Sequence, residues 1–185
     1  MSVCPQGQDI RRLTEILARA HRGEIPEEEA FEQAWRVATE RNPLPAVCSR
    51  VCPHECEGAC NRAEQDCAVG INSIERFLGD WAIERGLKHR KITDKVQPEK
   101  IAVIGSGPAG LSCAYHLARR GYKVTIFEAF PQPGGMLRYG IPRFRLPRDI
   151  LDAEIEKILD LGIELRTNIT VGRDIPFDEI KAEYD

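Results

Sequence analysis

IAVIGSGPAGLSCAYHLARRGYKVTIFE, residues 101–128, decides the fold of the second half of this 185-residue chain. Its first five residues form the continuous apolar run of a buried parallel strand, and KVTIFE (123–128) has the character of a second strand. Between the two lies a helical pattern that ends at Gly121. This order predicts the strand–helix–strand unit of a doubly wound, parallel α/β sheet.

The glycines between the first strand and the helix predict a dinucleotide site. The match to G-x-G-x-x-G consists of Gly105, Ser106, Gly107, Pro108, Ala109 and Gly110. Gly105 allows a tight turn, Gly107 lets backbone amides approach a pyrophosphate, and Gly110 allows close contact between helix and strand. Glu128 ends the second strand, where it can accept hydrogen bonds from a ribose. The glycine spacing does not distinguish an FAD site from an NAD site. The alternative to a dinucleotide site is a glycine-rich turn that binds no ligand.

The alternation of strand and helix continues after this unit. A proline- and glycine-rich loop (129–147) precedes an expected helix near 148–161 and a strand near 163–167. Within the helix that follows the glycine loop, Cys113 is expected to be a small buried residue.

Before residue 100 the sequence predicts three amphipathic helices and an intervening cysteine loop. Asp9 is expected to cap the first helix, Pro26 to begin the second, and Asn72 or Ser73 to cap the third. We therefore predict a helical domain over 1–86, a linker over 87–99 and a partial Rossmann-like α/β domain over 100–185.

Composition narrows the choice of partners and compartment. The chain has 26 Lys and Arg against 29 Asp and Glu, a net charge of -3, so neither nucleic acid nor an anionic membrane is an expected partner. No apolar run approaches the roughly 20 residues that a membrane span needs. An odd count of seven cysteines and no apolar signal-peptide core argue against a secreted disulfide scaffold, so we expect a cytoplasmic protein.

Four of the cysteines recur every fourth residue in CSRVCPHECEGAC, at Cys48, Cys52, Cys56 and Cys60. Structural zinc sites use C-x2–4-C pairs separated by a longer spacer, and the common local run of iron–sulfur proteins is the tighter C-x2-C. The spacing therefore predicts a soft-metal site without choosing the metal. Free structural thiols are the alternative, although exposed thiols in a polar loop are a liability.

Taken together, the motifs resemble a known oxidoreductase family. The segments that carry the resemblance are CP (4–5), NPLPAVCSRVCPHECEGACNR (42–62), INSIERF (71–77), the stretch quoted first, and PGGMLRYGIPRFRLP (133–147). In this order they resemble the small subunit of bacterial glutamate synthase and the N-terminal part of dihydropyrimidine dehydrogenase. The resemblance implies a helical domain that holds [4Fe–4S] clusters, followed by an FAD-binding domain.

The same resemblance implies roles for individual residues. The glycine loop (105–110) would cradle the FAD phosphates, and Glu128 would hold the FAD ribose. Five further residues would lie along or near the FAD: Gly135, Leu137 and Arg145, and, by a weaker match, Val51 and Val171. Arg145 also has a plain interpretation as a solvated loop arginine. No catalytic acid, base or nucleophile is implied, because the chemistry is electron transfer.

For the cluster, the resemblance implies Cys4, Cys52 and Cys56 as ligands and leaves the fourth open. Cys60 usually completes another cluster with thiols upstream of the matching region, and in this chain we favour it as the fourth ligand because iron prefers thiolate. Glu75, which matches a glutamine ligand of some members, is the alternative.

The resemblance also implies that further protein domains are needed for a complete oxidoreductase. The family continues into an NAD(P)H-binding domain, which we expect to lie outside these 185 residues. The predicted partners are therefore the remainder of the flavoprotein and a redox partner subunit. The competing hypothesis is a zinc-stapled helical interaction domain joined to an incomplete nucleotide-binding fold.

Overall fold

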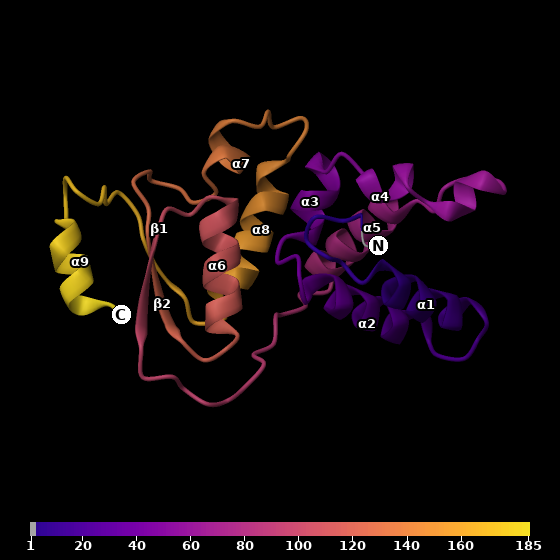
Figure 1. The fold of residues 1–185 in the computed structure, drawn as a ribbon, viewed down its shortest axis with the longest axis horizontal. Helices are drawn as coiled ribbons and strands as arrows, with labels where there is room; N and C mark the ends of the chain where they lie inside the picture. The colour runs from indigo at the N-terminus through magenta and orange to yellow at the C-terminus, as the bar shows by residue number, and fades with distance from the viewer. Residues whose placement is uncertain (1–2) are drawn as a thin grey trace. The chain divides into compact units, whose positions relative to one another are not determined.

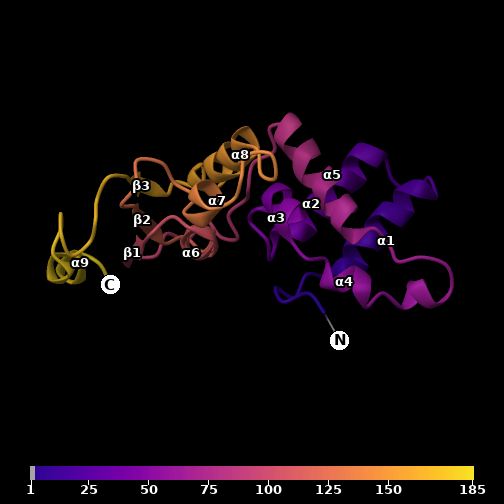
Figure 2. The ribbon, with the colours of Figure 1, turned by 90° about the horizontal axis from the view of Figure 1, so that it is seen from above.

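The computed structural model describes residues 3–185. They form two compact units, one ending at Leu87 and the other beginning at Lys88. The ribbon shows helices in the first unit and a small sheet with helices in the second (Figures 1 and 2). This confirms the predicted fold class, a helical domain followed by a Rossmann-like α/β domain.

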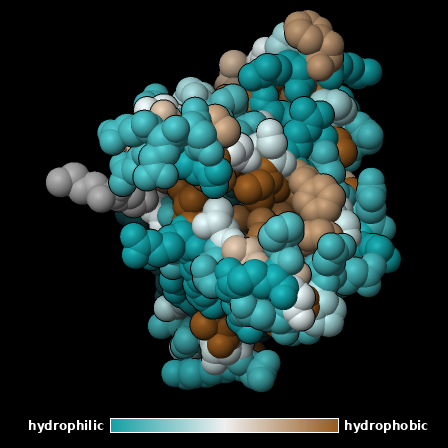
Figure 3. All heavy atoms as spheres, turned by 90° about the vertical axis from the view of Figure 1, so that its right-hand side faces the viewer, coloured by the Kyte–Doolittle hydropathy of each residue, from teal (hydrophilic) through white to brown (hydrophobic). Residues whose placement is uncertain are grey.

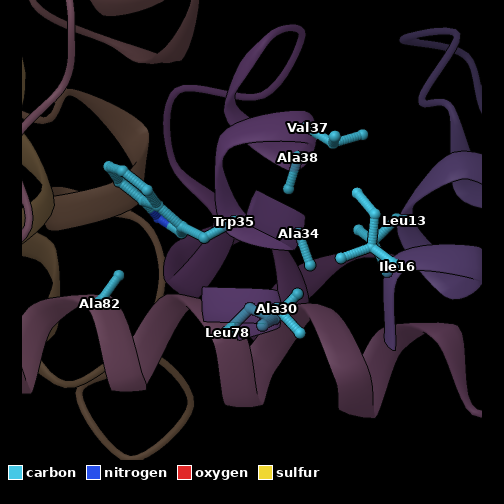
Figure 4. Packing of buried hydrophobic residues seen from close by; sticks show 9 residues of the cluster. All are labelled: Leu13, Ile16, Ala30, Ala34, Trp35, Val37, Ala38, Leu78 and Ala82. Atoms are coloured by element: carbon cyan, nitrogen blue, oxygen red, sulfur yellow. The ribbon is translucent and has the colours of Figure 1, made fainter. Parts of the chain in front are cut away.

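The first unit consists of helices of unequal length. In chain order they are α1 (Ile10–His21), α2 (Glu27–Thr39), α3 (Pro45–Val51), α4 (Glu55–Gly58), the 3-10 helix η1 (Asn61–Glu64) and α5 (Ile71–Glu84). α1, α2 and α5 pack around a core in which Leu13 approaches Ala34 and Trp35 lies near Ala82 (Figure 4). Small residues on α2 let the helices approach closely, and Trp35 fills the remaining space.

The predicted N-terminal residue of α1 is confirmed, whereas the predicted starts of α2 and α5 differ from those in the structure. Asp9 accepts a hydrogen bond from the Arg12 N–H at 3.0 Å, as an N-cap does. Pro26 is the residue before α2 and not its first residue. Neither Asn72 nor Ser73 caps α5, because both lie inside a helix that Gly70 precedes. The Asn72 backbone N–H instead donates to the Glu57 carboxylate at 2.8 Å.

The cysteine loop is more helical than the sequence predicts, and its first helix lies directly on α5. A β-carbon added at Gly79 of α5 would stand 2.5 Å from the Ala46 backbone nitrogen of α3. The two helices therefore meet at a position where only glycine fits. Arg50, also on α3, reinforces the contact with a 2.8 Å ion pair to Asp80 of α5.

The second unit contains three parallel strands in the order β1-β2-β3. Its elements are β1 (Lys100–Ile104), α6 (Pro108–Ala118), β2 (Lys123–Phe127), α7 (Met136–Tyr139), α8 (Arg148–Leu159), β3 (Glu164–Arg166) and α9 (Phe177–Glu183). Figures 1 and 2 show α6 and α8 on one side of the sheet and α9 on the other. In this unit, the short helices α7 and α9 were not predicted from the sequence.

The segment expected to be a linker is attached to the second unit. The Ile92 N–H donates to the Arg119 carbonyl at 2.8 Å, and the Gln97 N–H donates to the Gly121 carbonyl at 3.0 Å. A β-carbon at Gly121 would stand 1.9 Å from the Lys95 carbonyl oxygen. The polar sequence of this segment therefore covers the end of α6 and does not span open solvent.

Among the described residues, none of the helices has the length and apolar character needed to cross a membrane. Figure 3 shows a mainly hydrophilic face of the molecule on which a few hydrophobic residues gather in a hollow.

Candidate functional site

The cysteines of the first unit surround a small hollow. It measures about 50 Å³ and is lined by the thiols of Cys4, Cys48, Cys52 and Cys56 together with the carboxylate-bearing Glu75. α3 carries Cys48 and is followed directly by Cys52, α4 carries Cys56, and α5 supplies the carboxylate. The start of the described chain runs beside α3 and α4, which brings Cys4 to the same place (Figures 1 and 2).

The structure thus brings together three of the predicted ligands, Cys4, Cys52 and Cys56, and the alternative fourth ligand Glu75. Cys60, which we favoured as the fourth ligand, does not line this hollow. With Cys56, it lines a neighbouring cavity of about 620 Å³. Hydrogen bonds from the backbone N–H groups of Val69 and Arg62 lower the pKa of Cys60, which favours its thiolate there.

Burial dominates the electrostatics of the hollow. It raises the pKa of Cys48 to about 12, with further contributions from the Glu75 carboxylate and the Cys52 thiol. It also raises the pKa of Cys56, and it raises the pKa of Glu75 against hydrogen bonds from Asn42 and Gln8. The hollow therefore disfavours negative charge unless a cation compensates for it, as a metal centre does.

The residues present fit a multi-iron cluster. Thiolates are the ligands that iron–sulfur clusters use, and a cluster of several irons holds its ligands farther apart than a single ion does. Within residues 3–185, no three His, Cys, Asp or Glu side chains converge closely enough to hold one ion. Four cysteines instead line the one small hollow described above.

The glycine loop of the second unit has the geometry of a phosphate-binding turn. Gly105 has a φ of +91°, and a β-carbon at Gly110 would stand 1.9 Å from the Gly105 carbonyl oxygen. Gly107 precedes the first turn of α6, whose N-terminal end follows β1 directly. The backbone N–H groups at this helix start favour an anion. A β-carbon at Gly107 would meet no atom within 4 Å, so the space above it is open.

Glu128 is buried at the end of β2 and already has partners within the chain. One of its carboxylate oxygens accepts hydrogen bonds from the Ser106 N–H at 2.8 Å and from the Ser106 hydroxyl. The other accepts from the Phe130 N–H at 2.8 Å. Burial opposes ionisation, but these hydrogen bonds outweigh it and lower the pKa of Glu128. The oxygen bound to Phe130 keeps capacity for a further donor such as a ribose hydroxyl.

A second loop rests on the glycine loop. The Gly134 N–H donates to the Ser106 carbonyl at 3.0 Å, and a β-carbon at Gly135 would stand 2.8 Å from the Gly107 Cα. Gly135 has a φ of +50°, so a side chain there would be strained as well as crowded. The structure therefore places Gly135, a predicted cofactor contact, directly beside the glycine loop.

Two arginines that the sequence analysis missed hold this second loop. The Arg148 guanidinium donates to the carbonyls of Leu137, Leu146, Arg138 and Ile141. The buried Arg138 side chain pairs with Asp152 of α8 and donates to the Pro133 carbonyl. Arginine in a proline- and glycine-rich stretch gives no signal of such a role, because the carbonyls it reaches are set by the loop conformation.

The remaining residues that were predicted to contact the FAD differ in burial and in the element that carries them. Leu137 is buried in α7, and Arg145 is exposed after it. Val171 forms an isolated bridge with Ile175. Val51 is the last residue of α3, in the other unit. Cys113 is exposed on α6 and not buried as expected, because the buried face of that helix is formed by Leu111, Ala114, Tyr115 and Ala118.

Two protein families match the chain, one in each unit. Residues 1–87 match dihydropyrimidine dehydrogenase domain II, 4Fe-4S cluster. Residues 103–148 match the NAD(P)-binding Rossmann-like domain. The two matches confirm the predicted resemblance and the order of the two domains, and the second description names NAD(P) and not FAD.

The chain is also similar to subunits of curated oxidoreductases. It is 40% identical over 155 residues to the glutamate synthase (NADPH) small chain of Escherichia coli strain K12, covering 83% of this chain and 33% of that protein. It is 42% identical over 156 residues to the NAD-dependent dihydropyrimidine dehydrogenase subunit PreT homolog of Salmonella typhi, covering 83% and 38%. It is 41% identical over 176 residues to the NADP(+)-dependent formate dehydrogenase subunit beta of Moorella thermoacetica, covering 84% and 25%.

The chain thus spans between a quarter and two fifths of the length of these relatives. The matches extend over both units, from the cysteine-bearing helices to the glycine loop. Residues 1–87 thus match the 4Fe-4S domain of the dihydropyrimidine dehydrogenase type, and over both units the chain is similar to oxidoreductase subunits such as the glutamate synthase small chain.

Proposed function

We propose that this chain is the electron-transfer module of an NAD(P)H-dependent flavin and iron–sulfur oxidoreductase. The observation that carries the proposal is the hollow in which Cys4, Cys48, Cys52 and Cys56 surround one space with Glu75. Thiols from the start of the chain and from the α3–α4 region have no packing reason to meet in a polar loop. A [4Fe–4S] cluster supplies the reason, because its four ligands must come to one site.

For the ligands, we infer Cys4, Cys52 and Cys56 with Glu75 as the fourth. Both candidates for the fourth position came from the sequence, and the geometry of the hollow supports Glu75 over Cys60. Cys48 is a second thiol within the same space, and its burial makes its deprotonation costly. Iron prefers thiolate over carboxylate ligands. Cys48 therefore competes with Glu75 for the fourth ligand position of the cluster.

For the nucleotide, we infer FAD at the glycine loop. The turn at Gly105, the helix start at Gly107 and the acceptor Glu128 suit the adenosine diphosphate half that FAD and NAD(P) share. The family resemblance carried by the sequence motifs implies FAD, and this implication supports FAD at the loop. When bound, FAD converts the two-electron transfer of NAD(P)H into single-electron steps.

The chain's own residues would bind and orient these groups and would not act as acids or bases. α6 presents its N-terminal N–H groups to the pyrophosphate, and the Gly134–Gly135 turn borders the same space. The hydrophobic residues around the cysteine hollow, Ile10, Leu13 and Ile71, exclude water from it. NAD(P)H would bind to another domain, and a redox partner subunit would deliver or accept electrons.

Anaerobic purification of the chain tests this proposal. We expect brown protein with about four irons and four sulfides per chain, a reduced-state EPR signal, and a flavin absorbance spectrum. Chromatography of the released nucleotide distinguishes FAD from NAD(P). Colourless protein with one zinc per chain and no EPR signal would instead establish the zinc-stapled interaction domain.

A further inference from the structure

Asn42 lies between the two groups that compete for the fourth cluster position. It is only 2% exposed, between the end of α2 and the start of α3. Its Nδ2 donates to Glu75 Oε1 at 2.8 Å, and its side chain also hydrogen-bonds to the Cys48 thiol. An amide nitrogen carries two protons, so one Nδ2 can serve both partners.

The backbone fixes Asn42 firmly in this position. Its own N–H donates to the Ala38 carbonyl at 3.0 Å, and its Oδ1 accepts from the Leu44 N–H at 3.1 Å. The side chain therefore has two separate tasks. Its oxygen shapes the turn that begins α3, and its nitrogen reaches Glu75, which lines the hollow. Glu75 Oε1 is engaged by this nitrogen, and Gln8 is the second side chain that hydrogen-bonds to the Glu75 carboxylate.

We propose that Asn42 is the positioning residue that presents the Glu75 carboxylate to the cluster. The inference rests on the proposed cluster in this hollow. A hydrogen bond to a metal-binding carboxylate fixes its orientation, and loss of such a partner typically weakens metal binding about 10- to 100-fold.

Asn42→Asp separates the two tasks of the side chain. Aspartate keeps an oxygen for the Leu44 N–H, so the turn retains its hydrogen bond. It loses both N–H donors and sets a second carboxylate against Glu75, which repels it. Adding Glu75→Gln reverses the pair: the new amide can donate through its Nε2 to the carboxylate introduced at position 42, and its Oε1 is then free to face the cluster.

The test compares the wild-type chain with N42D, E75Q and the double variant, each loaded anaerobically with iron and sulfide. Asn168→Asp, an exposed site in the second unit, is the matched control. We measure the EPR g values of the reduced cluster, the rate of iron loss to a chelator, and helical circular dichroism. We expect N42D to shift the g values and to speed iron loss on the order of 10-fold, with the double variant returning toward wild type.

Three results would overturn the inference. The first is wild-type g values and iron retention in N42D. The second is strictly additive effects in the double variant, which would mean that the two side chains do not act as a pair. The third is a loss of helical signal in N42D that the double variant does not recover, which would assign Asn42 to the turn alone. Absence of a cluster in the wild-type chain would instead refute the proposed function itself.

Discussion

The Glu128 carboxylate accepts hydrogen bonds from both the backbone N–H and the hydroxyl of Ser106, a residue 22 positions earlier in the chain. This joins the end of β2 to the middle of the glycine loop. The acid expected to hold a ribose therefore also shapes the loop expected to hold the phosphates. Ligand binding and the stability of the second unit should both depend on its charge.

Glu128→Gln should make the second unit less stable near neutral pH by about 1–2 kcal/mol, because hydrogen bonds to a carboxylate become weaker bonds to an amide. The pKa of Glu128 in the folded chain lies below its ordinary value of 4.5. Its contribution is therefore complete above that value and disappears as pH falls through the folded pKa. Urea unfolding at several pH values checks this: the wild-type advantage should shrink below pH 4.5. A pH-independent difference would contradict it.

Gly107 and Gly110 should respond differently to alanine. A β-carbon at Gly107 meets no protein atom, whereas one at Gly110 would lie 1.9 Å from the Gly105 carbonyl oxygen. We expect Gly107→Ala to keep the wild-type melting temperature and lose nucleotide affinity by at least about tenfold, since the side chain would occupy ligand space. Gly110→Ala should destabilise the unit itself. Calorimetry with added FAD measures both, and unchanged affinity in Gly107→Ala would remove the nucleotide site from this loop.

The cysteine hollow predicts an order of effects among single serine substitutions. Cys52→Ser should abolish the cluster EPR signal, because this thiol lines the hollow with Glu75. Cys60→Ser should leave iron content and signal largely intact, because Cys60 lines the adjoining cavity. Exposed Cys67→Ser serves as the control. Loss of the cluster in Cys60→Ser would restore Cys60 as the fourth ligand.

The contact between α3 and α5 predicts that a substitution at Gly79 lowers the stability of the first unit without replacing a residue that lines the hollow. In Gly79→Ala the new methyl group would meet the Ala46 backbone at 2.5 Å, which backbone movement must relieve. We expect a loss of about 1–3 kcal/mol in the free energy of unfolding. Gly58→Ala, which meets no atom within 4 Å and has no positive φ, should be nearly neutral. Equal stability of the two variants would show that the helices are not in contact.

Arg148→Met should loosen the loop that its guanidinium holds through four carbonyls. Methionine retains much of the apolar stem but none of the donors. Amide hydrogen exchange between residues 137 and 146 should become faster, while exchange in β1 and β2 stays slow. Arg143→Met, at an exposed position, is the matched control. Unchanged amide exchange rates in the loop would mean that contacts other than those of Arg148 hold its conformation.

Local pattern predicted the βαβ unit well, because the apolar strands, the glycine spacing and the terminal Glu128 are all determined by neighbours in sequence. It failed where structure depends on distant contacts. Asn72 has the chemistry of a helix cap, yet it bonds with Glu57 across the unit. The choice between the two candidates for the fourth ligand could not be made from the sequence, because C-x3-C spacing does not show that Cys60, just before η1, lines the adjoining cavity while Glu75 of α5 lines the hollow.

The position of Cys4 has a mechanical consequence. A cluster bound to Cys4 and to the thiols of α3 and α4 would close a covalent ring that contains all of α1 and α2. In the chain-entropy treatment, cross-linking a loop of this length removes disorder from the unfolded chain equivalent to about 4 kcal/mol. Oxidative breakdown of the cluster would open this ring. The helical unit would then lose its tether at the same moment as its redox centre, and a damaged molecule would become the one most easily unfolded and removed.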